Sequence, residues 1–410
     1  MKNSFVITDV SAGEILDSRG NPTIKVKVAA GTSSGEFAVP SGASTGSHEA
    51  LEKRDGEKSR FRGLGVKKAV SSVEKEIKKA LVGKDVREQK EIDSILLNLD
   101  GTDNKGRIGA NAILGTSIAC AKAAASASGM ETYEYLAKML KTSPRTPYLY
   151  LNLVNAGKHA SSRLAFQEYM IVPLTADAGE SLVIADKIRS ELRNRVVRKY
   201  SPFSANFGDE GGFVIEADKV SEPLEILSDI IKKLKLAGKV GLAIDVAASS
   251  FFENGKYSVD GKKISADGLM KIYRKMIEKF PIVSIEDPFH EEDFENFGKL
   301  LALEPGIKII GDDLTVTNPD RLLTAIRRKS ISGIIIKPNQ IGTLSETIEV
   351  MRLADENRVA CIVSHRSGET SDDFIADFAY AFGSFGLKAG APNRGERVAK
   401  YNRLMEISKK

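Results

Sequence analysis

The stretch Gly333-Ile334-Ile335-Ile336-Lys337-Pro338 places three consecutive isoleucines before a lysine and a proline. A short run of β-branched apolar residues is typical of a strand buried on both faces, as in a parallel sheet. The proline ends the strand, so Lys337 stands at its carboxyl end. A lysine partly removed from water loses proton affinity and can act as a base near neutral pH. The alternative is that Lys337 only extends its ammonium group into solvent.

Size and composition favour a soluble protein with a large core. The chain has 410 residues, 42% of them hydrophobic, which is enough for two domains or a large barrel plus an extra domain. The net charge of +5 is too small to require a nucleic-acid partner. Cys120 and Cys361 lie in no zinc-ligand pattern. There is no signal peptide pattern and no apolar run of membrane-spanning length, so we expect a cytoplasmic protein.

The first part of the chain predicts an α+β domain over residues 1–130. Ile24, Val26 and Val28 alternate with lysines, the period of a half-buried strand in an antiparallel meander. The three expected strands are 4–12, 22–30 and 35–40. Apolar residues at helical spacing predict helices over 66–81, 86–99 and 109–128. The segment 40–48, rich in small and hydroxyl residues, is either a lid loop or a connector, and composition alone favours the connector.

From about residue 145 short apolar runs alternate with helical segments. The expected strands are 148–154, 168–172, 240–246, 282–286, 307–311, 333–337, 359–364 and 385–388. Eight strands separated mostly by helices predict a TIM-like (β/α)8 barrel over residues 131–410. An open doubly wound sheet is the alternative, although the chain has no G-x-G-x-x-G fingerprint and no Walker loop.

A basic run, Lys187–Lys199, interrupts this pattern. Such a run is either a nucleic-acid-binding patch or the solvated face of a helix. Apolar residues at helical spacing within the run favour the helix face.

Charged side chains gather at the predicted strand ends, where the chemistry of a barrel takes place. Three successive strands end in acidic residues: Asp245, then Glu286 with Asp287, then Asp312 with Asp313. Carboxylates crowded at one mouth are hard to sustain without a cation. Because these ligands are all oxygens, the expected ion is Mg²⁺.

The remaining strand ends carry cationic groups. These are Lys337, His365-Arg366-Ser367 and Lys388. Arginine suits bidentate binding of a phosphate or a carboxylate. A divalent ion, a carboxylate substrate and a lysine base together permit removal of a proton α to that carboxylate. Glu168 and Glu210 are candidates for protonating a departing hydroxide, and the alternative for each is an ordinary surface carboxylate.

Nine motifs, in sequence order, resemble the enolase family. They are DSRGNPT (17–23), PSGASTG (40–46), GANAILG (109–115), GDEGG (208–212), IEDPF (285–289), DDLTVTNP (312–319), KPNQIGTLSET (337–347), SHRSGET (364–370) and LKAGAPNRGER (387–397). The resemblance runs from about residue 5 to residue 408. It implies an enolase-type barrel with an irregular start, and a hydro-lyase that reversibly dehydrates 2-phospho-D-glycerate to phosphoenolpyruvate in glycolysis and gluconeogenesis.

The resemblance also implies roles for individual residues. Lys337 would remove the C2 proton, and Glu210, with Glu168 beside it, would assist loss of the C3 hydroxyl. Two Mg²⁺ ions are implied: the first held by Asp245, Glu286 and Asp312, the second by Ser44 when substrate binds. Arg366 and Ser367 would bind the phosphate, and Lys388 the carboxylate side. The full substrate-binding set would be His159, Glu168, Glu286, Asp312, His365, Arg366, Ser367 and Lys388.

A few positions depart from the family pattern. Ala156 and Ser161 stand where the family usually has glycine, and we expect them to stiffen the loop around His159. Ser250 replaces a common glutamate, and Phe294 replaces a common tryptophan. All candidate catalytic and metal residues are nevertheless present.

The resemblance further implies a homodimer. Its subunits often pair a glutamate on the second strand with an arginine near the C-terminus of the other subunit. The matching positions here are Lys25 and Glu406, so both charges are reversed. We predict that Lys25 meets Glu406 of a second subunit, and the alternative is two unrelated exposed charges.

Two other functions compete with this interpretation. One is a related barrel enzyme acting on a non-phosphorylated acid, which Arg366, Ser367 and the Ser44 loop disfavour. The other is a scaffold or a plasminogen-binding protein at the cell surface, suggested by the terminal Lys409-Lys410. A frayed basic tail is by far the plainer explanation of those two lysines.

Overall fold

The computed structural model describes residues 4–42, 46–157, 160, 162–201 and 205–409. Ser44, His159, Ser161 and Lys410 therefore lie outside the described residues. The chain forms two compact units: Met1–Arg145 with Ile336–Arg352 and His365–Gly383, and Thr146–Ile335 with Leu353–Ser364 and Ser384–Lys410. The division into domains at residue 130 stays a prediction.

The first unit contains the predicted antiparallel meander. Its strands, in the order β1-β2-β3, are β1 (Ile7–Leu16), β2 (Pro22–Ala30) and β3 (Ser33–Ala38). The bounds 4–12 predicted for the first strand are wrong at both ends. Pairing with β2 continues until Leu16 meets Pro22, directly beside the turn that begins at Asp17, so β1 extends along the whole of its partner.

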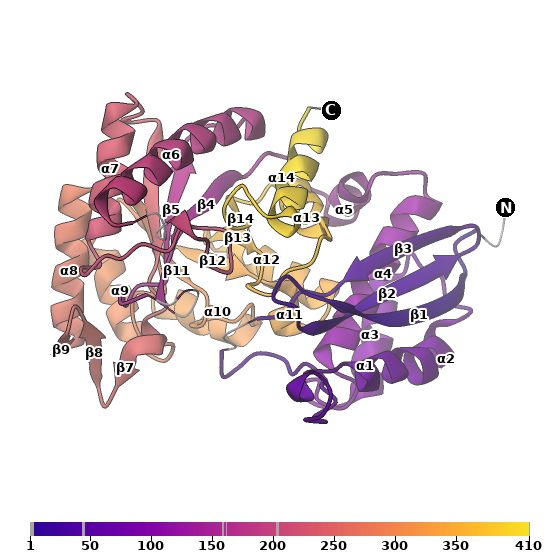
Figure 1. Cartoon of the computed structure of the whole chain (residues 1–410). Helices are drawn as coiled ribbons and strands as arrows, with labels where there is room; N and C mark the ends of the chain where they lie inside the picture. Colours follow the sequence, from indigo (N-terminus) through magenta and orange to yellow (C-terminus); the bar gives the residue numbers. More distant parts are fainter. Residues whose placement is uncertain (1–3, 43–45, 158–159, 161, 202–204, 410) are drawn as a thin grey trace. The chain divides into compact units, whose positions relative to one another are not determined.

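Helices of the first unit lie along one side of this meander (Figure 1). They are α1 (Lys67–Ser72), a π-helical turn (Val73–Ile77), α2 (Lys78–Leu81), α3 (Gln89–Asp100), α4 (Ala110–Ala127), α5 (Thr132–Leu140), α11 (Pro338–Ile341) and α13 (Phe374–Phe382). The almost wholly buried α4 packs against β2 and β3. A Cβ atom at Gly35 in β3 would lie only 2.2 Å from the backbone nitrogen of Ala123, so glycine permits this close approach.

The second unit contains a closed barrel in the order β10-β11-β12-β13-β14-β4-β5-β6, and all eight predicted strands are confirmed. The strands are β4 (Tyr148–Asn155), β5 (Glu168–Pro173), β6 (Val240–Asp245), β10 (Ile282–Glu286), β11 (Lys308–Gly311), β12 (Gly333–Ile336), β13 (Ala360–Ser364) and β14 (Gly386–Lys388). β5 runs antiparallel to both β4 and β6. This reversal is the irregular start that the family resemblance implied.

Helices lie outside the barrel strands (Figure 1). They are α6 (Ala178–Lys199), α7 (Glu222–Lys233), α8 (Ala266–Lys279), α9 (Phe294–Leu303), α10 (Pro319–Arg327), α14 (Gly395–Ile407) and part of α12 (Leu344–Glu356). A small sheet that the sequence did not predict adds β7 (Phe252–Glu253), β8 (Lys256–Val259) and β9 (Lys262–Ile264). Among the described residues, no helix is both long enough and apolar enough to cross a membrane.

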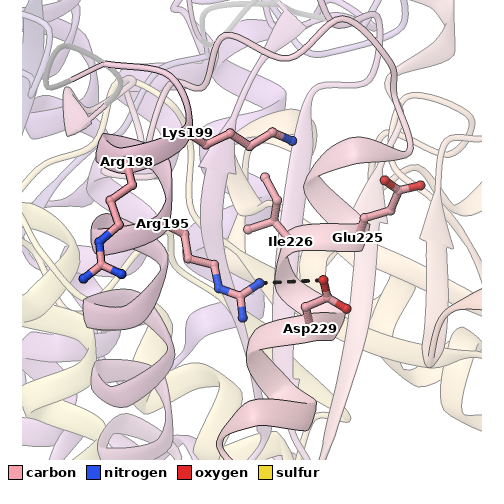
Figure 2. A pocket seen from close by; sticks show the side chains of 6 residues that line it. All are labelled: Arg195, Arg198, Lys199, Glu225, Ile226 and Asp229. Carbon is pink, nitrogen blue, oxygen red and sulfur yellow. Dashed lines mark ion pairs between the residues drawn. The ribbon is translucent and has the colours of Figure 1, made fainter.

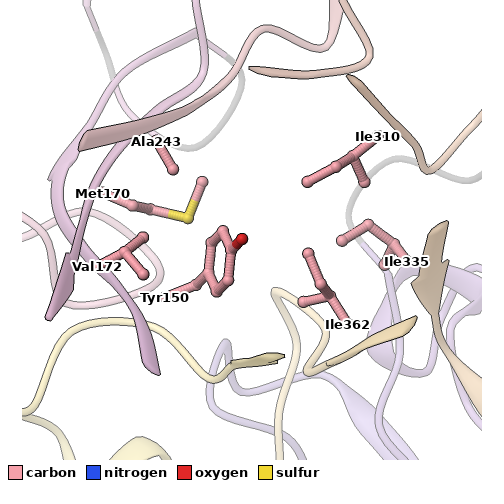
Figure 3. Close-up of a cluster of buried hydrophobic side chains, with 7 residues drawn as sticks. All are labelled: Tyr150, Met170, Val172, Ala243, Ile310, Ile335 and Ile362. Carbon is pink, nitrogen blue, oxygen red and sulfur yellow. The ribbon is translucent and has the colours of Figure 1, made fainter. Parts of the chain in front are cut away.

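Large apolar side chains fill the inside of the barrel. Figure 3 shows them pointing toward one another within the ring of strands: Tyr150, Met170, Val172, Ala243, Ile310, Ile335 and Ile362. Gly386 in β14 makes room for Tyr150, since a Cβ atom there would lie 2.7 Å from its ring. The barrel is therefore a packed core, and polar chemistry is confined to its mouth.

Candidate active site

Strand register brings three acidic side chains together at the barrel mouth. Asp245 ends β6 and pairs with Glu286, which ends β10. On its other side Asp245 pairs with Glu168. Glu168 begins its strand, but β5 is antiparallel, so its start lies where the neighbouring strands end. The reversed strand therefore supplies an acid that a strictly parallel barrel would place at the opposite end.

These three carboxylates are almost completely buried. Relative exposure is 1% for Glu168, 4% for Asp245 and 2% for Glu286. Burial raises the pKa of Glu286 well above its usual range, and the neighbouring charge of Asp245 raises it further. Asp312, which directly follows β11, also contributes to that rise and is itself buried. The mouth thus concentrates negative charge with little access to water.

Lys388, the last residue of β14, forms ion pairs with these carboxylates. Its Nζ atom lies 2.9 Å from Asp245 Oδ2, 2.8 Å from Glu286 Oε1 and 3.1 Å from Glu168 Oε2. Burial alone lowers the pKa of the Lys388 ammonium, but the negative charges of Asp245, Glu168 and Glu286 outweigh burial and hold that pKa well above its ordinary value. The raised pKa favours a protonated, positively charged Lys388 among these three carboxylates.

Glu210 reaches the same region from a glycine-rich loop. Its Oε2 atom accepts a hydrogen bond of 2.9 Å from Asn152 Nδ2, and its side chain is buried. Gly211 has a φ of +83°, and a Cβ atom there would lie 1.9 Å from Asn393 Oδ1. A residue with a side chain does not fit this turn, so the glycine fixes where Glu210 points.

The donor set suits a hard divalent cation. Asp245, Glu286 and Asp312 offer only carboxylate oxygens, they end or follow adjacent strands, and they are buried. Oxygen-only ligands of this kind are those that Mg²⁺ and Ca²⁺ prefer, whereas Zn²⁺ sites draw on sulfur and nitrogen. A dication would also offset charge that Lys388 alone does not neutralise. These residues therefore fit a hard divalent cation, and the choice of Mg²⁺ stays a prediction.

The first unit holds the predicted phosphate-binding group. Arg366, 4% exposed at its side chain, forms a bidentate ion pair with the equally buried Glu49, at 3.0 Å for Nη1–Oε2 and 3.2 Å for Nη2–Oε1. Arg366 Nη1 also donates to Asn339 Oδ1 at 3.2 Å. Ser367 Oγ accepts a long bond of 3.5 Å from Arg19 Nη1. Glu49 and Asn339 together thus fix the position of the Arg366 guanidinium.

Lys337 and His365 also belong to the first unit. Lys337 directly follows β12 and precedes α11, and it is half-buried. His365 directly follows β13 and is buried. Each predicted residue therefore stands at the strand end where the sequence located it.

Two polar residues, Glu49 and Asn152, were missed by sequence reasoning, and Asp287 was named among the acidic strand ends without a role of its own. Glu49 follows the hydroxyl-rich segment without any pattern that marks it. Asn152 lies inside an apolar strand, and a buried polar residue in such a run is a usable signal. Asp287 sits beside a predicted ligand, but sequence alone does not say toward which side its carboxylate points.

This fold and this site define a class: barrel enzymes that act on acids with the help of a divalent metal. Two family models match the chain, "Enolase, C-terminal TIM barrel domain" over residues 145–410 and "Enolase, N-terminal domain" over residues 7–136. The enolases of Methanocaldococcus jannaschii and Thermococcus gammatolerans are each 47% identical to it over 99% of the chain, and 96% and 95% of those relatives are covered. The enolase of Pyrococcus furiosus is likewise 47% identical. The chain belongs to the enolase family, which is metal-dependent.

Proposed function

We propose that this chain catalyses the reversible dehydration of 2-phospho-D-glycerate to phosphoenolpyruvate with Mg²⁺, as a hydro-lyase of glycolysis and gluconeogenesis. One observation carries the proposal. In a member of the enolase family, strand pairing places Glu168, Asp245 and Glu286 side by side, and Lys388 forms ion pairs with them. Such a set accepts a dication together with the carboxylate of an acid substrate.

Asp245, Glu286 and Asp312 would hold the first Mg²⁺. Bound there, Mg²⁺ supplies positive charge that stabilises the negative charge developing on the substrate carboxylate. Lys388 holds the same end of the substrate, because its ammonium is fixed at the mouth by three carboxylates. The proposal includes a second Mg²⁺, which Ser44 would bind together with the substrate. Ser44 lies outside the described part of the chain.

Two proton transfers complete the reaction. Lys337 Nζ takes the proton from C2, and the electron pair of that C–H bond forms the C2–C3 double bond. The C3–O bond breaks, and the departing hydroxide takes a proton from Glu210 and leaves as water. Asn152 orients Glu210 for this step through the bond to Oε2, and Glu168 lies in the same buried acidic group.

Arg366 and Ser367 bind the phosphate in this proposal. A buried, bidentate carboxylate partner holds the Arg366 guanidinium in one plane, which matches the geometry of phosphate recognition. His159, outside the described residues, and His365 would line the substrate pocket. We further propose a homodimer with a Lys25–Glu406 pair between subunits, and a cytoplasmic location, on the basis of the family resemblance.

The decisive experiment is formation of phosphoenolpyruvate from 2-phosphoglycerate, followed by its ultraviolet absorbance with and without Mg²⁺. Lys337→Ala removes the base and should lower kcat by about 10²–10⁴-fold or more. Lys299→Ala, at an exposed lysine on α9, is the matched control and should leave the rate unchanged. A native protein that makes no phosphoenolpyruvate, or a Lys337→Ala variant with full turnover, contradicts the proposal.

A further inference from the structure

Asp287 occupies an unusual position in the second unit. It follows Glu286 at the end of β10, it is 4% exposed, and its φ of +42° lies in the left-handed region. A non-glycine residue adopts this conformation only where its surroundings hold it there. Its backbone nitrogen donates to the Ile310 carbonyl at 3.0 Å, which ties the turn to the adjacent strand β11.

The carboxylate of Asp287 is fully engaged with the next loop. One oxygen accepts the main-chain N–H of Asp312 at 2.9 Å, and the other accepts the main-chain N–H of Asp313 at 2.7 Å. The side chain therefore spans two consecutive residues of the segment that follows β11. One of these two residues is an expected metal ligand.

That segment needs an anchor, because its own conformation is unfavourable. Val316 and Thr317 both have left-handed φ values, +43° and +52°, and both are completely buried. Two β-branched residues in succession rarely adopt this conformation. The main-chain N–H groups of Thr315 and Val316 fold back onto the carbonyl of Asp312, so any shift of Asp312 moves the whole loop.

The carboxylates of Asp287, Asp312 and Asp313 approach within 4.8 Å of one another and form an alternative group of oxygen ligands. The hydrogen bonds favour another role for Asp287. Its two oxygens point to two different N–H groups one residue apart, which is the arrangement of a side chain that caps a turn. Direct ligands remain available in Asp245, at the end of the neighbouring strand β6, and in Glu286, which directly precedes Asp287.

We propose that Asp287 is a positioning residue for the metal site and not a ligand: it fixes the main chain of Asp312 and Asp313, and thereby aims the Asp312 carboxylate at the ion shared with Asp245 and Glu286. This inference rests on the proposed function. Residues that orient metal ligands in this way typically change metal affinity about 10–100-fold when they are replaced.

The test is Mg²⁺ binding to the full chain, measured by calorimetry independently of activity. Asp287→Asn keeps the size of the side chain but turns an NH₂ group toward one of the two N–H donors, so one bond is lost. We expect the dissociation constant for Mg²⁺ to rise about 10–100-fold. The Mg²⁺ concentration for half-maximal rate should rise in parallel, while kcat at saturating Mg²⁺ changes little. A merely structural role would instead lower kcat at every Mg²⁺ concentration.

Asp313→Asn is the matched control. It removes an adjacent carboxylate but leaves the main-chain N–H that Asp287 holds, so Mg²⁺ affinity should stay close to the native value. Asp287→Ser, whose hydroxyl still accepts one N–H group, should give an intermediate loss and provides the same test if Asp287→Asn does not fold.

Two results would overturn the inference. Native Mg²⁺ affinity in folded Asp287→Asn or Asp287→Ser shows that the side chain does not position the site. An equal loss in Asp313→Asn shows that the three aspartates themselves bind the ion. A native protein that binds Mg²⁺ but makes no phosphoenolpyruvate counts against the proposed function alone, and the comparison of variants still decides the inference.

Discussion

Glu49 is the buried ion-pair partner of Arg366, the residue proposed to bind phosphate. Its carboxylate pairs with the Arg366 guanidinium through two bonds, and it also accepts the N–H of Gly46 at 3.0 Å. The pair is buried on both sides, at 4% and 6% side-chain exposure. Removing one partner of such a pair leaves the other as a buried charge without compensation, whereas removing both partners leaves no buried charge.

Glu49→Ala should therefore lower the free energy of unfolding by about 3–5 kcal/mol, measured by urea denaturation. The double variant Glu49→Ala/Arg366→Met should recover a large part of that loss. Glu91→Ala, which breaks an exposed pair with Lys84, serves as control and should cost at most about 1 kcal/mol. Strictly additive losses in the Glu49 and Arg366 variants would contradict this account.

The individual site residues differ in how far sequence can predict them. Asp245, Glu286 and Lys388 follow from one rule, because charged residues at the carboxyl ends of parallel strands meet at one mouth. Glu168 follows only once β5 is known to be reversed, which no local pattern indicates. Glu49 was missed because its importance comes from a partner that lies 317 residues away in the chain.

At the scale of elements, one buried carboxylate joins three helices of the first unit. Asp93 on α3 accepts hydrogen bonds from Ser117 Oγ on α4 at 2.6 Å and from Gln89 Nε2 at 3.0 Å. Its other oxygen accepts the N–H of Ser345 at 2.9 Å, at the start of α12. Asp93 thus caps α12, the helix that begins a few residues after Lys337.

Burial raises the pKa of Asp93, although its hydrogen bonds to Ser117 and Ser345 oppose the rise. Between the unfolded value near 3.8 and the raised folded value, the folded state binds more protons than the unfolded state. The contribution of Asp93 to stability is therefore complete below the unfolded pKa and is lost as pH rises through the folded pKa.

The compared quantity is the difference in free energy of unfolding between the native protein and Asp93→Asn, native minus variant. We expect this difference to fall as pH increases from about 4 through the raised pKa of Asp93. Denaturant titrations of both proteins at several pH values measure this difference. Asp267→Asn, at the exposed start of α8, is the control and should show no such trend. A difference that is constant with pH would rule out a raised pKa at Asp93.

The basic run Lys187–Lys199 has a structural explanation in the pairing of α6 with α7. Arg195 lies 3.7 Å from Asp229, Lys233 lies 2.7 Å from Glu191, and Lys199 pairs with Glu222. Side chains of both helices line a pocket of about 360 Å³. Figure 2 shows the Arg195–Asp229 pair reaching from one helix to the other. Two basic residues of the run thus pair with acidic residues of α7, and a third ion pair joins the helices in the opposite sense, which favours the helix-face interpretation of this run.

The types of the elements were more predictable than their ends. Each barrel strand carries an apolar run that stands out against its flanks, so all eight were found. The small sheet β7–β9 was missed because strands of two to four residues are too short to show a period. The end of β1 was missed because cross-strand pairing with β2, and not its own sequence, sets its length.

At the scale of the whole molecule, the reversed strand β5 shows what local patterns leave out. Strand count and spacing predict a barrel, but strand direction depends on the length and path of the connections, which apolar periodicity does not encode. The resemblance to enolases implied only an irregular start to the barrel, and the topology shows that this irregularity is the reversal of β5. Fold class and most of the charged mouth were thus available from pattern, whereas the direction of β5 came only from the structure.

The last prediction concerns the assembly of two subunits. Within one chain, Lys25 pairs with Glu36, and Glu406 lies 3.4 Å from Arg403. Both side chains remain largely exposed, at 44% and 60%, so each is accessible to a partner. In a twofold dimer the proposed Lys25–Glu406 contact would occur twice.

Lys25→Glu should weaken the dimer roughly two- to thirty-fold in dissociation constant, since each of two exposed pairs contributes about 0.2–1 kcal/mol. Sedimentation velocity at several protein concentrations measures the change, and adding Glu406→Arg should restore native association. Lys27→Glu is the matched control: Lys27 lies on the same strand face and also pairs with Glu36, at 3.3 Å, but it has no predicted partner in the second subunit. Equal weakening by Lys25→Glu and Lys27→Glu, or no rescue by Glu406→Arg, would show that the reversed charges do not meet across the interface.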